Sequence, residues 1–112
     1  VVAGTSFSML QTLNYAYKVM QLQGVKLHPY KSFYLATLGG ARALQLDQQI
    51  GNLEPGSEAD FVVLDYQATP LLSYRMAQTK TIEERLFVMM TLGDDRMVKH
   101  TFAMGEAVYS RH

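Results

Sequence analysis

Apolar side chains recur every three or four positions along the first part of the chain, a spacing that places them on one face of an α-helix. The positions on this face are Leu10, Leu13, Ala16 or Tyr17, and Met20. A hydroxyl of Thr5, Ser6 or Ser8 can cap the start of the helix, and no neighbouring base suggests a catalytic role for the serines. Gly24 ends the helix, because glycine tolerates the left-handed conformation that commonly follows one.

Pro29 predicts the start of a second helix, since proline at the first helical position loses no hydrogen bond. This helix runs to Gly39-Gly40. We interpret these glycines as a closely packed helix break, because the Lys and Ser or Thr of a phosphate-binding loop do not follow them. Residues 41–46, "ARALQL", predict a third, short helix. The first half of the chain is therefore expected to be helical up to about Ile50.

The character of the sequence changes in the middle of the chain. Residues 51–60, "GNLEPGSEAD", are rich in turn formers, with Pro55 fixing one turn dihedral and Gly56 free to take a positive one. The run "FVVLD" that follows is β-branched and aromatic, which predicts a strand covered on both faces. Residues 66–80 are expected to be irregular, because Pro70 would break a regular element.

The last third of the chain predicts a helix followed by two strands. Thr81 and Glu84 have the spacing of a capping box, and Gly93 lies where this helix should end. Residues 87–90, "FVMM", form a core stripe in which methionine fills gaps. Two alternating segments then flank Met104-Gly105, which predicts a hairpin. The predicted fold class is α+β.

Composition and charge narrow the classes of function. The 112 residues suffice for one modest domain but fall far short of the roughly 250 residues of a closed (β/α)8 barrel. Ten Lys and Arg balance ten Asp and Glu, so neither nucleic acid nor an anionic membrane is an expected partner. No apolar run reaches the length of a membrane span. The chain contains no cysteine, which excludes disulfides and thiolate metal sites.

The three histidines are far apart in the sequence, whereas a hydrolytic metal site needs several ligands that converge on one ion. His28 precedes Pro29 and is interpreted as a helix-start residue. His100 lies in an alternating pattern and is interpreted as a solvent-side strand residue, and His112 ends the chain. Neither His-x-His nor His-Glu-x-x-His occurs. An autonomous metallohydrolase is therefore disfavoured.

Two acidic pairs, Glu83-Glu84 and Asp94-Asp95, are interpreted as structural rather than catalytic. Acid–base catalysis needs two carboxyl groups that face a shared cleft with separated pKa values, and adjacency in sequence does not provide this. The glutamates suit the first turn of a helix, where they stabilise its dipole, and the aspartates suit the loop after it. The residues thus supply no catalytic group and no metal ligand of their own, and substrate-binding residues stay unknown.

Three stretches together resemble enzymes of the amidohydrolase superfamily. Residues 36–46 followed by 50–65 are similar to the segment in which these enzymes leave their last barrel helices and re-enter a small β-sandwich domain. The matching positions are Gly51, Glu54, Pro55, Gly56, Ala59 and Asp60. Residues 98–109 resemble the final hairpin of that sandwich, with Gly105 at its turn. More specifically, residues 3–24 together with 85–96 resemble the bacterial guanine deaminase family.

This resemblance implies the C-terminal segment of a longer enzyme. Residues 1–50 would be the terminal helices of a (β/α)8 barrel, and residues 51–112 the C-terminal part of the β-sandwich domain. Asp60 would be a turn-stabilising acid, and residues 61–64 a sandwich strand. Val2 departs from the small residue expected at its position. The reading frame would extend roughly 300 residues upstream, as the size of the barrel requires.

The resemblance also implies a function for the parent enzyme, which would hydrolyse guanine to xanthine and ammonia in purine catabolism with a zinc-activated water. One metal-ligating aspartate would fall immediately before Val1, and the other ligands and the acid–base carboxylate further upstream. No catalytic residue and no metal ligand of the family would then fall on this chain, which is expected to bind no zinc itself. The parent is expected to be a cytoplasmic homo-oligomer whose partner is a purine.

Two alternatives stay open. The parent could be another amidohydrolase-superfamily aminohydrolase acting on a different heterocyclic ring, since upstream loops would decide the substrate. The chain could instead be a non-enzymatic α+β interaction module whose apolar faces bind a partner or itself. As a segment it would leave strand edges and an apolar helical face unpaired, so we expect the isolated chain to be inactive and to self-associate.

Overall fold

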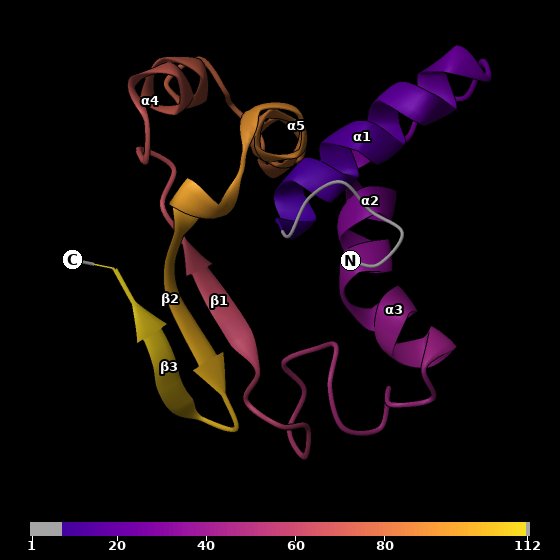
Figure 1. Ribbon diagram of the computed structural model, residues 1–112, viewed down its shortest axis with the longest axis vertical. Helices are drawn as coiled ribbons and strands as arrows, with labels where there is room; N and C mark the ends of the chain where they lie inside the picture. The colour runs from indigo at the N-terminus through magenta and orange to yellow at the C-terminus, as the bar shows by residue number, and fades with distance from the viewer. Residues whose placement is uncertain (1–7, 112) are drawn as a thin grey trace. The chain divides into compact units, whose positions relative to one another are not determined.

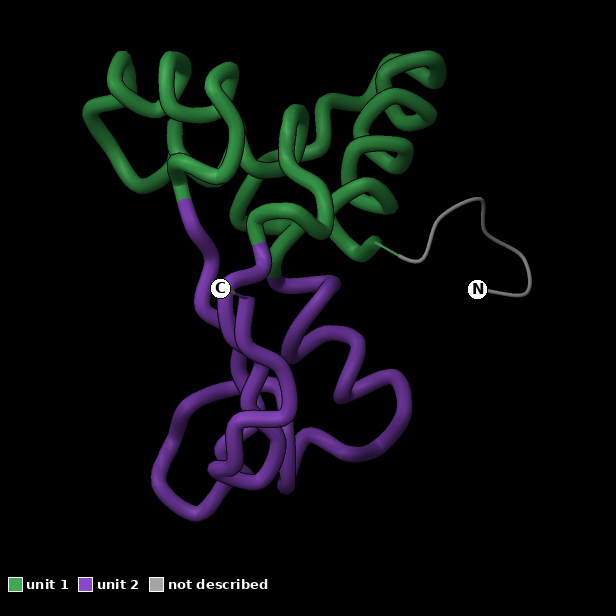
Figure 2. Tube along the Cα trace, turned by 60° about the vertical axis from the view of Figure 1, so that its left-hand side comes forward, with its two compact units in different colours: residues 1–33, 66–97 green, residues 34–65, 98–112 purple. Residues whose placement is uncertain are grey.

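The computed structural model describes residues 8–111 and is α+β, as predicted (Figure 1). In chain order the elements are α1 (Met9–Leu22), α2 (Pro29–Ala36), α3 (Leu38–Ala43), β1 (Phe61–Leu64), α4 (Pro70–Met76), α5 (Ile82–Leu92), the short 3-10 helix η1 (Asp95–Met97), β2 (Val98–Ala103) and β3 (Glu106–Ser110). The chain divides into two compact units, shown in Figure 2. Of the described residues, unit 1 contains 8–33 together with 66–97, and unit 2 contains 34–65 together with 98–111.

Helix α1 begins at one of the three predicted caps. The Ser8 hydroxyl accepts a hydrogen bond from the Gln11 N–H at 3.4 Å, whereas Thr5 and Ser6 lie outside the described residues. The helix ends before Gly24, which has φ of 77° as predicted. Leu10 and Leu13 of the predicted apolar face are buried.

The core of unit 1 lies where α1 and α4 pack against α5. The predicted stripe at residues 87–90 is confirmed, because Val88, Met89 and Met90 are buried. Two polar contacts cross this packing. The Asn14 side-chain amide donates to the Thr91 carbonyl oxygen at 2.6 Å, and the fully buried Ser32 hydroxyl donates to the Met90 sulfur at 2.9 Å. These bonds join α5 to α1 and to the first turn of α2.

The boundary between α2 and α3 differs from the prediction. Helix α2 begins at Pro29 as expected but ends at Ala36, and the break falls on Thr37, whose φ and ψ are −121° and −102°. Gly39 and Gly40 therefore lie inside α3, which ends at Ala43. Close packing at the glycines is confirmed, because a Cβ on Gly39 would lie 2.8 Å from a ring carbon of Tyr34.

The expectation of an irregular stretch around Pro70 is wrong. Pro70 is the first residue of α4, and the Thr69 hydroxyl caps the helix by accepting from the Leu72 N–H at 3.2 Å. Proline interrupts a helix only in its interior, whereas at the first position its missing N–H costs no intrahelical bond. A Thr-Pro pair therefore predicts a helix start, as His28-Pro29 did earlier in the chain.

The three strands of unit 2 form an antiparallel sheet in the order β1-β2-β3. The predicted hairpin is confirmed, and its turn residues Met104 and Gly105 both have positive φ, 51° and 81°. Two positive φ values indicate a type I′ turn, whose twist matches that of the flanking strands. Across β1 and β2, the rings of Phe61 and Phe102 stack with centroids 4.5 Å apart.

Strand β1 is more exposed than its sequence predicted. A continuous β-branched and aromatic run predicts burial on both faces, yet Phe61, Val62 and Val63 are 37%, 51% and 38% exposed. The reason is that, among the described elements, β1 packs chiefly against its partner strand β2, and no helix packs substantially against its faces. The expectation of a strand covered on both faces is wrong for the structure as described.

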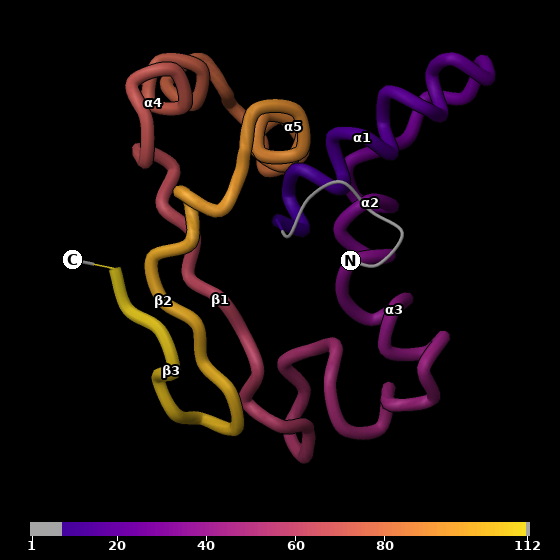
Figure 3. Tube along the Cα trace, viewed as in Figure 1, coloured from indigo at the N-terminus to yellow at the C-terminus, as the bar shows by residue number. Residues whose placement is uncertain are grey.

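Residues 51–60, here called the connecting loop, join the α3 region to β1 within unit 2, and Figure 3 traces their course. Pro55 and Gly56 occupy the centre of a turn closed by a hydrogen bond from the Ser57 N–H to the Glu54 carbonyl oxygen at 3.1 Å. Gly56 has φ of 95°, so proline followed by a positive-φ glycine indicates a type II turn. The Asn52 side-chain oxygen accepts from the Ser57 hydroxyl at 2.8 Å and stiffens the loop.

The end of the connecting loop is bonded to the hairpin turn. The Gly105 N–H donates to the Ala59 carbonyl oxygen at 3.0 Å, and the Met104 N–H donates to a carboxylate oxygen of Asp60 at 2.8 Å. Asp60 therefore stabilises a turn, as expected, but the turn is the β2–β3 hairpin some 44 positions later in the sequence. Because the hairpin turn lies so far along the sequence, the pattern of residues around Asp60 could not reveal it as the partner.

We predict that Gly51→Ala lowers the free energy of unfolding by about 3 kcal/mol or more. Gly51 has φ of 103°, and a Cβ there would lie 2.9 Å from the Ala41 Cβ and 3.0 Å from the Leu38 Cα. Gly56→Ala is the matched control, since φ is similar but no atom lies within 4 Å of the added Cβ, and it should cost only about 1–2 kcal/mol. Urea unfolding of the intact protein measures both, and equal losses would contradict a role for the contact with α3.

We predict that Asp60→Ala destabilises the protein by about 1–2 kcal/mol, because the Met104 N–H loses its acceptor. Asp60→Asn keeps an acceptor oxygen at the same place and should lose less than half as much. Thermal unfolding of both variants provides the comparison. If the asparagine variant is as unstable as the alanine variant, the hydrogen bond does not account for the stabilisation.

Candidate functional site

His28 lies immediately before α2, where its ring makes two polar contacts. Its Nδ1 accepts a hydrogen bond from the Tyr30 N–H at 3.1 Å, and its Nε2 lies 2.7 Å from Oε1 of Glu83 in the first turn of α5. The interpretation as a helix-start residue is confirmed. The contact with Glu83 was missed, because the two residues are far apart in the sequence and nothing local marks the pair.

His100 lies in the central strand β2, and its Nδ1 is 3.0 Å from the Ser110 hydroxyl oxygen of β3. Its side chain is only partly exposed, so it is less solvent-facing than the sequence predicted. His112 lies outside the described residues. Neither His28 nor His100 contributes to a cluster of metal-ligating side chains within residues 8–111.

The glutamate pair has the structural role that the sequence predicted. Glu83 and Glu84 both occupy the first turn of α5. The Thr81 hydroxyl accepts from the Glu84 N–H at 3.1 Å, and the Glu84 carboxylate accepts from the Lys80 N–H at 2.6 Å. In a standard capping box the glutamate carboxylate accepts from the N–H of the cap residue, here Thr81. The Glu84 carboxylate accepts from the N–H of the preceding residue instead, so this half of the box is shifted by one residue.

Asp94, in the turn after α5, forms an ion pair with Arg96 of η1. Two nitrogens of the Arg96 guanidinium contact both carboxylate oxygens of Asp94, with the shortest distance 2.7 Å, and the Arg96 N–H donates to the same carboxylate at 2.9 Å. The Asp94 side chain is 14% exposed. The guanidinium hydrogen bonds lower the pKa of Asp94 from its usual value of 3.8, although partial burial opposes the shift. Asp94 lies in the loop as predicted, whereas Asp95 is the first residue of η1. The ion pair leaves Asp94 unsuited to accept a proton near neutral pH.

A third ion pair, absent from the sequence-based candidates, lies in unit 2. Arg111, which follows β3, places a guanidinium nitrogen 2.6 Å from Asp65, which follows β1. The Arg111 N–H also donates to the Lys99 carbonyl oxygen at 2.8 Å and extends the β2–β3 ladder. The pair therefore links the chain segments at one end of the sheet. In the sequence, Asp65 and Arg111 are an acid and a base that each follow a strand. Only the strand order shows that they lie close enough to pair.

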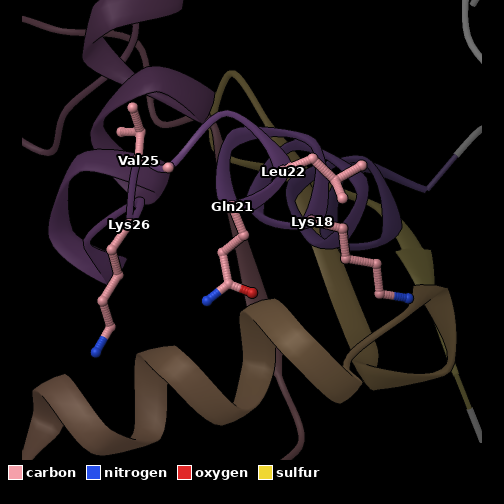
Figure 4. Close-up of a pocket in the computed structure, with 6 residues that line it drawn as sticks. Lys18, Gln21, Leu22, Val25 and Lys26 are labelled. Carbon is pink, nitrogen blue, oxygen red and sulfur yellow. The ribbon is translucent and has the colours of Figure 1, made fainter.

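Unit 1 has a surface depression of about 620 Å³ at the end of α1, lined by Lys18, Gln21, Leu22, Gly24, Val25 and Lys26. Figure 4 shows the side chains of Lys18, Gln21 and Lys26 extending to the same side, with the Gln21 amide between the two amines. The lining contains no histidine or carboxylate. These six lining residues therefore include none of the side chains that commonly bind zinc.

Unit 2 has a smaller and more polar depression of about 440 Å³ beside the connecting loop. Its lining residues are Leu38, Arg42, Asp47, Gln48, Asn52, Glu54, Pro55, Gly56 and Ser57. Several of these groups already have partners. Arg42 donates to the Tyr34 hydroxyl at 2.9 Å, and the Asn52 oxygen accepts from Ser57. Of these contacts, those of Asn52 lie within the connecting loop and hold it in shape.

The described residues do not fit a zinc site. Across residues 8–111 no group of three or more His, Cys, Asp and Glu side chains could hold a metal ion. The titratable groups instead cap helices or form pairs, as the contacts of His28, Glu84 and Asp94 show. No reaction step can be assigned to these residues. Within the same part of the chain, no helix has the length and apolar character needed to cross a membrane.

We predict that Arg96→Gln raises the pKa of Asp94 toward its usual value, because the guanidinium hydrogen bonds are the main cause of the lowering. Since the folded pKa lies below the unfolded one, the pair stabilises the fold above about pH 4 and this contribution is lost as the pH falls through the lowered pKa. NMR titration of the Asp94 carboxyl carbon measures the shift. Arg96→Lys keeps the positive charge but cannot make the bidentate contact, so the pKa of Asp94 in this variant should lie between those in the wild type and in Arg96→Gln. An unchanged titration in the glutamine variant would refute the assignment.

Comparison with known proteins places the chain in a family. Residues 1–108 match the model of the amidohydrolase family. The chain is 58% identical over 110 residues to guanine deaminase of Escherichia coli (strain K12), covering 98% of this chain and 25% of that protein. It is 37% identical over 114 residues to a probable guanine deaminase of Deinococcus radiodurans, covering 99% of this chain and 26% of that protein.

Solved structures show the same relationship. The chain superposes on E. coli guanine deaminase with a TM-score of 0.95, covering 98% of this chain and 26% of that one. On guanine deaminase from Bradyrhizobium japonicum the TM-score is 0.82 at 37% identity, covering 97% of this chain and 29% of that one. The chain thus spans about a quarter of the length of the relatives it matches. With the family model matching nearly its whole length, the chain belongs to the amidohydrolase family.

Proposed function

We propose that these 112 residues form the closing quarter of a guanine deaminase, an enzyme that converts guanine and water to xanthine and ammonia. The observation that carries the proposal is 58% identity across 98% of the chain to E. coli guanine deaminase, together with a TM-score of 0.95. Agreement in sequence and in backbone over nearly every residue favours the same activity as well as the same fold.

In this proposal the chain supplies support rather than chemistry. The described contacts of His28, Glu84 and Asp94 are a helix cap, a capping box and an ion pair. The groups that activate water and move protons would therefore come from the rest of the enzyme. Zinc is the metal that we propose for the parent, held by residues outside this chain. The residues of this chain would position the last helices and strands of the enzyme around that site.

The proposal extends to the layout of the parent. Residues 1–50 would supply the terminal helices of a (β/α)8 barrel, and residues 51–112 the second part of a β-sandwich. The exposed side chains of β1 and β3 support this layout, because apolar sheet surface is normally covered. Val62 and Val108, on β1 and β3, are 51% and 63% exposed. We further propose a cytoplasmic, homo-oligomeric enzyme of purine catabolism.

We predict that the intact gene product releases ammonia and forms xanthine from guanine, and that it contains a bound metal. Ammonia release, xanthine formation and metal analysis of the purified product test this directly. Deamination of another heterocyclic ring without activity on guanine would favour a different aminohydrolase. A folded product with neither metal nor deaminase activity would favour an interaction module and contradict the proposal.

We predict that the isolated chain of residues 1–112 releases no ammonia from guanine and self-associates in sedimentation. Exposed apolar side chains drive the association, so the double variant Val62→Thr and Val108→Thr, which keeps β-branched residues at both positions, should associate less. Zinc-dependent deamination by the isolated chain would show that it contains the catalytic site. A monomeric wild-type chain would contradict the expected loss of covering partners.

A further inference from the structure

His28 occupies the cap position of α2. Pro29 is the first helical residue, and the His28 carbonyl oxygen accepts the first intrahelical hydrogen bond from the Ser32 N–H at 3.0 Å. The N–H of Tyr30, the second helical residue, points to His28 Nδ1 at 3.1 Å. A cap residue normally uses a side-chain oxygen to accept from the second or third N–H of the helix. Here an imidazole nitrogen does so.

The contacts determine which ring nitrogen carries the proton. A backbone N–H can only donate, so Nδ1 must be an unprotonated acceptor. The neutral ring then carries its proton on Nε2, which lies 2.7 Å from the Glu83 carboxylate and donates to it. Both ring nitrogens are therefore satisfied in one neutral tautomer. The ring bridges the start of α2 and the first turn of α5 within unit 1.

A second proton on the ring would affect the two contacts in opposite ways. At Nδ1 it would place a donor against the Tyr30 N–H, and it would put positive charge at the positive end of the α2 dipole. At Nε2 the contact with Glu83 would become an ion pair. The groups that face the ring are Glu83 from α5 and, from α2, the Tyr30 ring with its centroid 5.1 Å away. The neighbouring Glu84 carboxylate accepts from the Lys80 N–H instead.

We propose that His28 is a proton-sensitive cap, which holds the start of α2 when neutral and releases it to become the charged partner of Glu83 when protonated. The release is local, because Leu27, Pro29 and Ser32 are buried and keep the backbone on either side in place. Histidine is suited to this role, since it gains its proton within the range of pH found in cells. The inference does not depend on the catalytic activity proposed above.

Amide hydrogen exchange of residues 30–32 in the intact protein tests the proposal, after correction for the intrinsic dependence of exchange on pH. In the wild type, protection should fall about fivefold between roughly pH 8 and pH 5, the effect of losing one ordinary helix cap. His28→Asn supplies a cap oxygen that does not titrate, so its protection should stay high at both pH values. His28→Gln can reach toward Glu83 but caps poorly, so its protection should be low at both.

Two results would overturn the proposal. The first is a loss of protection between pH 8 and pH 5 that is equal in His28→Asn and in the wild type. Such a result would show that a group other than His28 causes the pH dependence. The second comes from NMR of protein with 15N-labelled histidine, in which His28→Asn identifies the His28 signals. At pH 8 we expect Nδ1 to be unprotonated and Nε2 protonated, as the two contacts require. A proton on Nδ1 under those conditions is incompatible with the cap.

Discussion

The close approach of Gly51 to α3 is the constraint on which unit 2 depends. A side chain at this position would collide with Ala41 and with the backbone of Leu38, so the chain can pass this close to α3 only with glycine at position 51. The loop then turns at Pro55-Gly56 and is bonded through Ala59 and Asp60 to the hairpin turn. One glycine and two hydrogen bonds thus connect a helix to a hairpin that lies far along the chain.

Unit 1 is held by a different kind of contact. Its helices pack through flexible and small side chains, with methionines of α5 filling the core and Asn14 and Ser32 donating across it. Such polar contacts fix the register of helices that apolar packing alone would leave free to slide. Two titratable residues of the unit serve the ends of its helices, His28 at α2 and Glu84 at α5. Both units therefore use their polar groups to hold structure in place, which suits a scaffold.

The sequence predicted the elements whose signals are local. Ser8, Pro29, Thr81 and the Met104-Gly105 turn each act on neighbouring residues, and each was placed correctly. Pro70 was misjudged because proline starts a helix in one context and breaks it in another, and only the preceding threonine distinguishes them.

Features set by distant partners could not be predicted in the same way. The exposure of β1 depends on which elements pack against it, and the pairs His28–Glu83 and Asp65–Arg111 join residues that only folding brings together. The same limit applies to the candidate site. The sequence indicated correctly that His28 starts a helix and that the acids lie at a helix end, but their partners became visible only in three dimensions.

We propose that this chain supplies the supporting part of a guanine deaminase, so it should work in place of the same part of a related enzyme. The decisive experiment is a chimera in which residues 1–112 replace the matching quarter of E. coli guanine deaminase. We expect the chimera to fold, to contain metal and to release ammonia from guanine at a rate comparable to the unaltered enzyme. A chimera that folds and holds its metal but leaves guanine unchanged would show that the chain does not serve such an enzyme.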